Sequence, residues 1–213
     1  MIRLCTIIVL FSFSLPVEAL GQSLEWQDLG SHRLAKLKIL QSDKYGFALL
    51  PNNKTGLLFA NKLSRMLVAR NRNLANGSGV AVGDINGDGL ADVYFCGLQT
   101  DNKLFRNLGD WKFEDVTQDS GVACPRQYST GALIEDIDGD GDNDLLVTGL
   151  AKGTRLFLND GNGRFTEDPN SGLFPKLGAT SMAMADYDLD GDLVLVKKLM
   201  NKYLILQLKN PIL

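Results

Sequence analysis

An acidic nine-residue loop occurs three times in this chain at nearly equal spacing. The copies begin at Asp84, Asp136 and Asp186, so the period is 52 and then 50 residues. In the first two copies, oxygen-bearing side chains occupy positions one, three, five and nine, and glycine occupies position six. This spacing lets a short loop wrap a hard cation of calcium's size. The candidate ligands are Asp84, Asn86, Asp88 and Asp92 in the first loop and Asp136, Asp138, Asp140 and Asp144 in the second.

The second loop is the most acidic part of the chain, because Glu135 and five aspartates lie within ten residues. Folding so many like charges together without a counter-ion would cost several kcal/mol at short range, and a cation is the simplest remedy. A metal-free turn is the alternative, since Asp, Asn and Gly favour turns for backbone reasons alone. The third copy keeps Asp186, Asp188 and Asp190 but has Val194 at position nine, which predicts a weaker site.

The residues after the loops exclude a helix-loop-helix calcium site. Such a site needs a bidentate Glu at position twelve, where this chain has Phe95 and Val147. The loops lead instead into two short apolar runs of strand-forming residues, 93–96 and 145–148. Each loop is therefore predicted to be the turn between two strands.

The segments between the loops repeat as well. Four short strand candidates occur in each of the first two units, at 78–82, 93–96, 103–107 and 111–116, then at 130–134, 145–148, 154–159 and 163–167, and a third unit opens at 180–185. Four strands in a period of this length are typical of one blade of a β-propeller. Phe105 with Phe113, and Phe157 with Phe165, recur at equivalent places and are predicted to pack between neighbouring blades.

These loops, together with the segments 104–109, 112–117 and 156–163, resemble FG-GAP/VCBS repeats, and in detail the secreted ASPIC/UnbV (cartilage acidic protein-like) group. The resemblance covers about Thr55 to Leu193. It implies an all-β fold, a partial integrin-α-like β-propeller of about two complete blades plus part of a third, with calcium-binding inter-strand loops. It also implies that the loop side chains at positions one, three, five and nine are calcium ligands. At position seven the resemblance implies a backbone carbonyl ligand, here from Leu90, Asp142 and Asp192.

Two departures from this pattern affect the expected fold. Propellers have about four to eight blades, so three units are too few to close a ring. The tail at 197–213 also lacks the Gly/Asn punctuation of the repeats. Two interpretations of the tail stay open: two further strands, favoured by the apolar Tyr203–Leu206 run, or a truncated or frame-shifted gene or a fragment of a longer protein. An open arc of blades would expose apolar edges and favour self-association.

The N-terminal residues are typical of a secretory signal peptide at 1–19. Arg3 supplies the charge, 4–15 the apolar stretch and Ala19 the cleavage site, while a retained membrane anchor is the alternative. Export to a periplasmic or extracellular location follows from a cleaved signal. In the next segment, 20–54, leucines at helical spacing between Gln22 and Tyr45 predict a short helix. Residues 56–60 are a strand candidate at the start of the repeat region, which is predicted to span 55–196.

Composition narrows the class of protein. With 45% hydrophobic residues and a net charge of −3, the chain is ordinary for a globular protein. No clustered Lys and Arg suggest a nucleic-acid surface. Cys96 and Cys124 remain after signal removal, and both a disulfide and two separately buried thiols stay open. His32 is the only histidine and is expected to be solvated.

The predicted function is that of a non-enzymatic, exported module that binds a protein or glycan in adhesion or matrix interaction, with structural calcium. The repetition of the loops argues against catalysis, because a catalytic carboxylate pair should occur once. No catalytic residue and no cofactor other than calcium is predicted. The alternatives are an accessory domain or fragment of a secreted hydrolase, or a truncated product without function.

Overall fold

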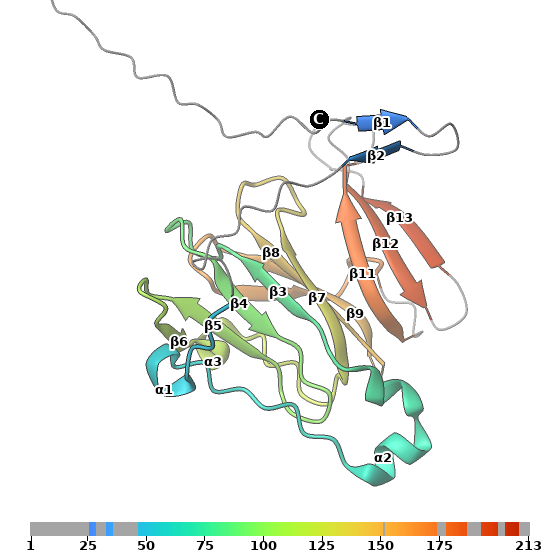
Figure 1. Cartoon of the computed structure of the whole chain (residues 1–213), viewed down its shortest axis with the longest axis horizontal. Helices are drawn as coiled ribbons and strands as arrows, with labels where there is room; N and C mark the ends of the chain where they lie inside the picture. Colours follow the sequence, from blue (N-terminus) through green and yellow to red (C-terminus); the bar gives the residue numbers. More distant parts are fainter. Residues whose placement is uncertain are drawn as a thin grey trace, which may run out of the picture. The chain divides into compact units, whose positions relative to one another are not determined.

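The computed structural model describes residues 26–28, 33–35, 47–150, 152–173, 178–186, 193–199 and 203–208. The chain divides into two compact units, residues 1–48 and 49–213. In the first unit, β1 (Trp26–Asp28) pairs with β2 (Arg33–Ala35) in a two-stranded antiparallel sheet (Figure 1). The predicted signal peptide, 1–19, lies outside the described residues.

The helix predicted between Gln22 and Tyr45 is wrong where this segment is described, since β1 and β2 are strands. The prediction depended on a weak helical spacing of leucines. Between the two strands the sequence contains Gly30 and Ser31, which favour a turn, and antiparallel pairing then satisfies the backbone groups of both segments.

The second unit contains three antiparallel sheets in which strands that follow one another in the chain are neighbours (Figure 1). Sheet I consists of β3 (Val80–Gly83), β4 (Asp92–Phe95), β5 (Lys103–Asn107) and β6 (Phe113–Asp115). Sheet II consists of β7 (Ser129–Glu135), β8 (Asp144–Gly149), β9 (Gly153–Asn159) and β10 (Phe165–Asp168). Sheet III consists of β11 (Ala179–Ala185), β12 (Leu193–Leu199) and β13 (Tyr203–Leu208).

The helices of the described part are short. They are α1 (Asn52–Thr55), α2 (Arg65–Arg70), the 3₁₀ helix η1 (Arg72–Asn76) and α3 (Thr117–Ser120). No helix among the described residues is long and apolar enough to cross a membrane. The predicted all-β class is therefore confirmed.

Each acidic loop joins the first two strands of its sheet, as the sequence predicted. In all three sheets, the residue before the loop pairs with loop position nine: Gly83 with Asp92, Glu135 with Asp144, and Ala185 with Val194. The three loops consequently occupy the same place in their sheets.

Sheet II is packed on both faces, which explains why all six residues of β8 are buried. Leu145 and Val147 belong to a first core that includes Tyr94 and Leu104 of sheet I. Leu146, which points to the opposite face, belongs to a second core that includes Leu195 of sheet III. A strand buried on both faces is expected to carry a continuous apolar run, and Leu145, Leu146 and Val147 form such a run in the middle of β8.

The first strands of the three sheets lie side by side, with β7 between β3 and β11 (Figure 1). Backbones approach closely between β3 and β7. A Cβ atom added to Gly79 would lie only 2.8 Å from the Cα atom of Gly131. Glycine at residue 79 therefore allows the first two sheets to approach at this edge.

Two sheet faces at the ends of this stack are open. On sheet I, Val80 and Val82 are 51% and 59% exposed, although their register equivalents in sheet II, Ala132 and Ile134, pack against the first core. On sheet III, Ile205 is 67% exposed, and its equivalent in sheet II, Leu156, is buried. The exposed faces thus carry the side chains that form cores elsewhere in the same fold.

The recurring phenylalanines Phe105 and Phe157 occupy equivalent register positions in sheets I and II. Phe157 lies in the first core, between sheets I and II, and Phe165 packs against it. Phe105 is equally buried, on the open side of sheet I, where its ring meets the edge of the Phe95 ring. Inter-sheet packing is therefore observed for the pair in sheet II.

The strand predicted at 56–60 is wrong, because this segment is not part of a described sheet. Gly56 ends α1 in the left-handed region (φ 77°), where the backbone turns. Phe59 then stacks on Phe95 with ring centroids 5.1 Å apart, so the segment is held by side chains. In the tail, β12 and β13 bear out the interpretation as further strands, and β12 runs past residue 196.

Both remaining cysteines are free thiols buried in the first core. Burial, together with the neighbouring Cys124, raises the pKa of Cys96 to about 12. Such thiols are poor nucleophiles at neutral pH.

Candidate metal centre

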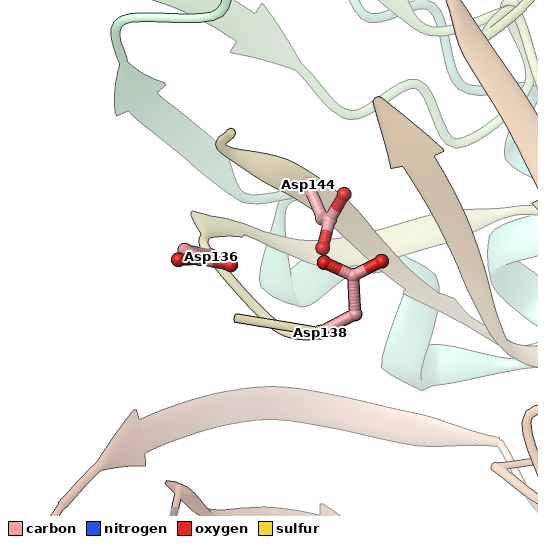
Figure 2. A group of neighbouring side chains, drawn as sticks. All are labelled: Asp136, Asp138 and Asp144. Atoms are coloured by element: carbon pink, nitrogen blue, oxygen red, sulfur yellow. The ribbon is translucent and has the colours of Figure 1, made fainter. Parts of the chain in front are cut away.

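The second acidic loop brings three carboxylates to one point. Oxygen atoms of Asp136, Asp138 and Asp144 all lie within 4.8 Å of one another. Asp136 follows β7, Asp144 begins β8, and Asp138 lies in the loop between them. Figure 2 shows the carboxylates of Asp138 and Asp144 facing each other. Three closely spaced carboxylates form an all-oxygen donor set of the kind that binds calcium.

Position one of the first two loops is held by main-chain N–H groups. The carboxylate of Asp84 accepts hydrogen bonds from Gly87 N at 2.8 Å and Gly89 N at 2.7 Å. Asp136 accepts the equivalent bonds, from Gly139 N at 2.8 Å and Gly141 N at 3.0 Å. All four glycines have positive φ, between 72° and 94°, which explains why the loops require glycine at positions four and six.

Position nine of the first two loops is a buried aspartate that bridges two strands and the loop. Asp92 accepts bonds from Ile85 N at 2.9 Å and Asn107 N at 2.7 Å. Asp144 accepts bonds from Ile137 N at 3.0 Å and Asn159 N at 2.9 Å. The two loops are therefore built in the same way around their last carboxylate.

The electrostatics of the two position-nine groups are unfavourable in the absence of a cation. The pKa of Asp144 is raised to about 6, mainly by burial and also by the charges of Asp138 and Asp140. The hydrogen bonds from Ile137 N and Asn159 N lower this pKa but do not offset the effect of burial. Burial likewise raises the pKa of Asp92. At Asp84 burial acts in the same direction, but the loop N–H groups together lower the pKa below its usual value.

Position three differs between the loops. In the first loop it is Asn86, whose Nδ2 donates to Asp88 Oδ2 at 2.9 Å. Asn86 Oδ1 is buried and has no hydrogen-bond partner among the described residues. A buried acceptor without a donor costs free energy, and a bound cation would satisfy it.

The remaining predicted ligands are less closely gathered. Asp88 and Asp140 accept hydrogen bonds from the N–H groups of position seven, Leu90 and Asp142, at 2.8 and 2.9 Å. The three-carboxylate group does not include Asp140 or Asp142. The Asp142 side chain lies against the hairpin at Gly161, where an added Cβ would be 2.5 Å from Asp142 Oδ2. The carbonyl ligands at position seven stay a prediction.

The third loop is described only at its start. Asp186 follows β11, whereas Asp188, Asp190 and Asp192 lie outside the described residues. Their role as ligands stays a prediction.

The structure adds three asparagines that the sequence reasoning missed. Asn107 Nδ2 donates to the carbonyl of Ala91 at 2.9 Å, and Asn159 Nδ2 donates to the carbonyl of Asn143 at 2.8 Å. Asn143 Nδ2 donates in turn to the carbonyl of Asp84 at 2.7 Å. Asn107 and Asn159 occur at equivalent places in the two repeats, which was the available signal for them.

Comparison with known proteins adds a family match and related chains. A profile described as FG-GAP-like repeat matches residues 84–147 and again 136–196. Cartilage acidic protein 1 of Xenopus tropicalis and that of Homo sapiens are each 29% identical over 120 residues, covering 55% of this chain and 18% of the relative. The protein of the same name from Mus musculus is 28% identical over 120 residues, covering 55% of this chain and 19% of the relative. The matched segment thus spans less than a fifth of the length of these relatives.

Proposed function

The chain belongs to the FG-GAP-like repeat family, and from this membership we propose that it is an exported calcium-binding β-propeller module. In this proposal, calcium is structural and the exposed surface binds a protein or a glycan. The supporting geometry lies in the two fully described acidic loops.

The second loop fits calcium by the chemistry of its donors. Asp136, Asp138 and Asp144 offer only oxygen atoms, and all three are already within reach of one ion. Calcium takes six to eight oxygen ligands, so Asp140 and the carbonyl of Asp142 would complete the site together with water. A bound ion would neutralise part of the charge that raises the pKa of Asp144.

The first loop fits calcium for an independent reason. Its buried Asn86 Oδ1 lacks a partner among the described residues, as a ligand atom would before metal binds. Asp84, Asp88 and Asp92 would supply carboxylates, and Leu90 a carbonyl. The third loop lacks the position-nine carboxylate and would bind more weakly through Asp186, Asp188, Asp190 and the carbonyl of Asp192.

One observation carries the proposal: the same cradle of main-chain N–H groups holds the position-one and position-nine aspartates in both loops. Because each loop is the turn between the first two strands of its sheet, a bound ion would fix that turn. Calcium would in this way stabilise each sheet and the packing between sheets.

The propeller architecture is supported by how the sheets are stacked. Each sheet is a meander, and the first strands β3, β7 and β11 lie side by side, as the inner strands of propeller blades do. The three sheets would form an arc of such a propeller.

A hydrolase, or an accessory domain of one, is less well supported. General acid-base chemistry needs two carboxylates in distinct environments at one place. Here Asp92 and Asp144 have equivalent surroundings in two separate loops. This equivalence favours a structural role that recurs with the repeat.

The proposed location rests on the N-terminal sequence, and the proposed partner rests on the relatives. A cleaved signal peptide at 1–19 would place the chain in an extracellular or periplasmic compartment. The relatives are named for cartilage, and a matrix protein or glycan is accordingly the class of partner that we propose for this chain.

A second copy of the chain is the proposed occupant of the open faces of sheets I and III. Each face is the register equivalent of a face that packs against a neighbouring sheet within the chain. Sheet III of one copy would therefore pack on sheet I of the next in the way that sheets II and III already pack.

The first test is thermal unfolding of the full chain by circular dichroism, with calcium and with chelator. The second is calorimetric titration of calcium into the same chain. We expect two ions to bind with higher affinity than a third, and the unfolding temperature to rise with calcium. Asp138→Asn should remove one of the two strong sites. Asp101→Asn, an exposed carboxylate outside the loops, is the matched control.

A calcium titration without heat, and an unfolding temperature that is the same with calcium and chelator, would refute the calcium proposal. Loss of a hydrolytic activity on changing one loop aspartate would overturn the assignment as a non-enzyme.

A further inference from the structure

The two described acidic loops are hydrogen-bonded to each other across the boundary between sheets I and II. Asn143, at position eight of the second loop, donates through Nδ2 to the carbonyl of Asp84 at 2.7 Å. Asn159, at the end of β9, donates through Nδ2 to the carbonyl of Ile85 at 2.9 Å. Both acceptors belong to the first two residues of the first loop.

These bonds complete a short path between the two position-nine carboxylates. Asp92 accepts from Ile85 N, and the carbonyl of Ile85 accepts from the Asn159 side chain. Asn159 N in turn donates to Asp144 at 2.9 Å. Only Ile85 and Asn159 stand between the last carboxylate of one loop and that of the other.

The path lies in a packed environment that leaves little room for adjustment. Ile85 is buried in the first core. A Cβ atom added to Gly163 would lie 3.2 Å from Ile85 Cδ1, so the hairpin after β9 also packs on this residue. A displacement of Asn159 would therefore be passed on to Ile85 rather than absorbed by empty space.

The first two repeats differ in one of the two linking residues. Asn107, the equivalent of Asn159 in sheet I, donates through Nδ2 to Ala91 of its own loop. Position eight of the first loop is Ala91 itself, which has no side-chain donor, whereas position eight of the second is Asn143. Asn143 is thus the linking residue that distinguishes the second repeat from the first.

We propose that Asn143 and Asn159 are positioning residues that make calcium binding at the two loops cooperative, an inference that rests on the proposed calcium function. An ion in the second loop holds Asp144 and the residues beside it in place. Asn143 and Asn159 then hold the backbone of Asp84 and Ile85, so the first loop loses less conformational freedom when it binds its own ion.

Repulsion between the two ions does not cancel this effect. The first loop contains three carboxylates and the second contains five, so each loop keeps a net negative charge after binding one divalent ion. Coupling between binding sites is typically about 5–150-fold in affinity, and a value near the lower end is expected for two hydrogen bonds.

The experiment is calorimetric titration of calcium into the full chain and into two single-loop variants. Asp138→Asn disables the second loop and Asp88→Asn the first, and neither residue belongs to the path. If the sites are coupled, the product of the two dissociation constants of the unchanged chain is at least about fivefold smaller than the product of the single-site constants.

Asn143→Ala should remove the coupling while two ions still bind. In this background, the product of the two dissociation constants should equal the product of the two single-site constants. Asn143→Ser, whose hydroxyl lies one bond closer to the backbone than Asn143 Nδ2 and should therefore weaken the bond to the Asp84 carbonyl, provides a second variant if the alanine form does not fold. The matched control is Asn162→Ala, an exposed hairpin asparagine whose Nδ2 donates within its own turn, and it should leave the coupling unchanged.

Equal products in the unchanged chain would overturn the coupling while leaving two calcium sites in place. Coupling that persists in both Asn143 variants would overturn the role of Asn143. Absence of calcium binding in the unchanged chain would instead refute the proposed function from which the coupling is derived.

Discussion

The aspartate at position nine has a structural role that does not depend on a metal ion. Asp144 accepts hydrogen bonds from the N–H groups of Ile137 and Asn159, and so ties the loop, β8 and β9 together. Asp138, by contrast, accepts from the neighbouring Asp140 N at 3.2 Å, within its own loop. Two carboxylates of one site therefore contribute to stability in different ways.

Asp144→Ala should destabilise the chain both with calcium and with chelator, because it leaves two buried N–H groups without acceptors. The expected loss is at least about 2 kcal/mol in free energy of unfolding, measured by urea denaturation. Asp138→Asn is the comparison and should destabilise the chain only when calcium is present. A chelated Asp144→Ala chain as stable as the unchanged chain would contradict this role.

A partly buried ion pair in sheet II provides a test of pH dependence. Arg155 donates to both carboxylate oxygens of Glu167, at 2.7 and 2.5 Å, and its guanidinium lies 4.8 Å from the centre of the Phe157 ring. The hydrogen bonds from Arg155 lower the pKa of Glu167 below its usual value. The pair therefore stabilises the fold above the unfolded pKa of Glu, about 4.3, and this contribution is lost as the pH falls through the lowered value.

Glu167→Gln should lower the free energy of unfolding at pH 7 by about 1 kcal/mol, less than is usual for hydrogen bonds to charged groups, because the Glu167 side chain is 36% exposed. The difference from the unchanged chain should disappear once the pH falls below the lowered folded-state pKa of Glu167, where the carboxyl is protonated in both states. Glu114→Gln is the control, since the Arg106–Glu114 pair is exposed and should contribute less than about 1 kcal/mol. A pH-independent difference for Glu167→Gln would contradict the ion-pair explanation.

At the scale of elements, the approach of β3 to β7 depends on the absence of side chains. A Cβ atom at residue 79 would meet the Gly131 backbone at 2.8 Å, whereas the nearest contact of one at residue 131 would be the Thr148 methyl group, at 3.4 Å. Neither glycine has a positive φ. The two positions thus differ in contact distance and not in backbone strain.

Gly79→Ala should cost about 1–3 kcal/mol in free energy of unfolding, because the two strands must separate to admit the methyl group. Gly131→Ala should cost less, since the methyl group of Thr148 can move slightly. Chemical denaturation of both variants measures the difference. Equal stabilities would show that the strands can separate at this edge without loss of packing.

At the scale of the whole molecule, the stack of sheets ends in two apolar faces. Leu104 and Leu156 are buried where a sheet follows them, and their equivalent Ile205 is exposed. Val82 is exposed on the opposite end, although its equivalent Ile134 packs in the first core. The two faces are thus the register equivalents of faces that pack against neighbouring sheets within the chain.

The full chain should accordingly self-associate as its concentration rises, and Val82→Lys should reduce the association by placing a charge in the contact. Sedimentation velocity at several concentrations measures this change. Lys112→Ala, at an exposed site in the β5–β6 hairpin, is the control. A chain that stays monomeric at all concentrations would exclude a second copy as the occupant of these faces.

Much of the fold could be predicted from short stretches of sequence. Strands and acidic loops depend on neighbouring residues: apolar runs favour strands, and a glycine in the left-handed region at positions four and six shapes the loop. The failures have a local origin too. Between Gln22 and Tyr45 the leucine spacing fits a helix only weakly, and at 56–60 an apolar run packs through Phe59 rather than through backbone pairing.

The positions of the repeats, and the residue types that each loop offers to a cation, were already present in the linear order of the chain. The connection between the loops was not, because it joins residues far apart in that order. Asn143 reaches Asp84 across 59 residues and Asn159 reaches Ile85 across 74. Only the packing of sheet II on sheet I brings these groups within hydrogen-bonding distance, and no local pattern records which side chains will meet there.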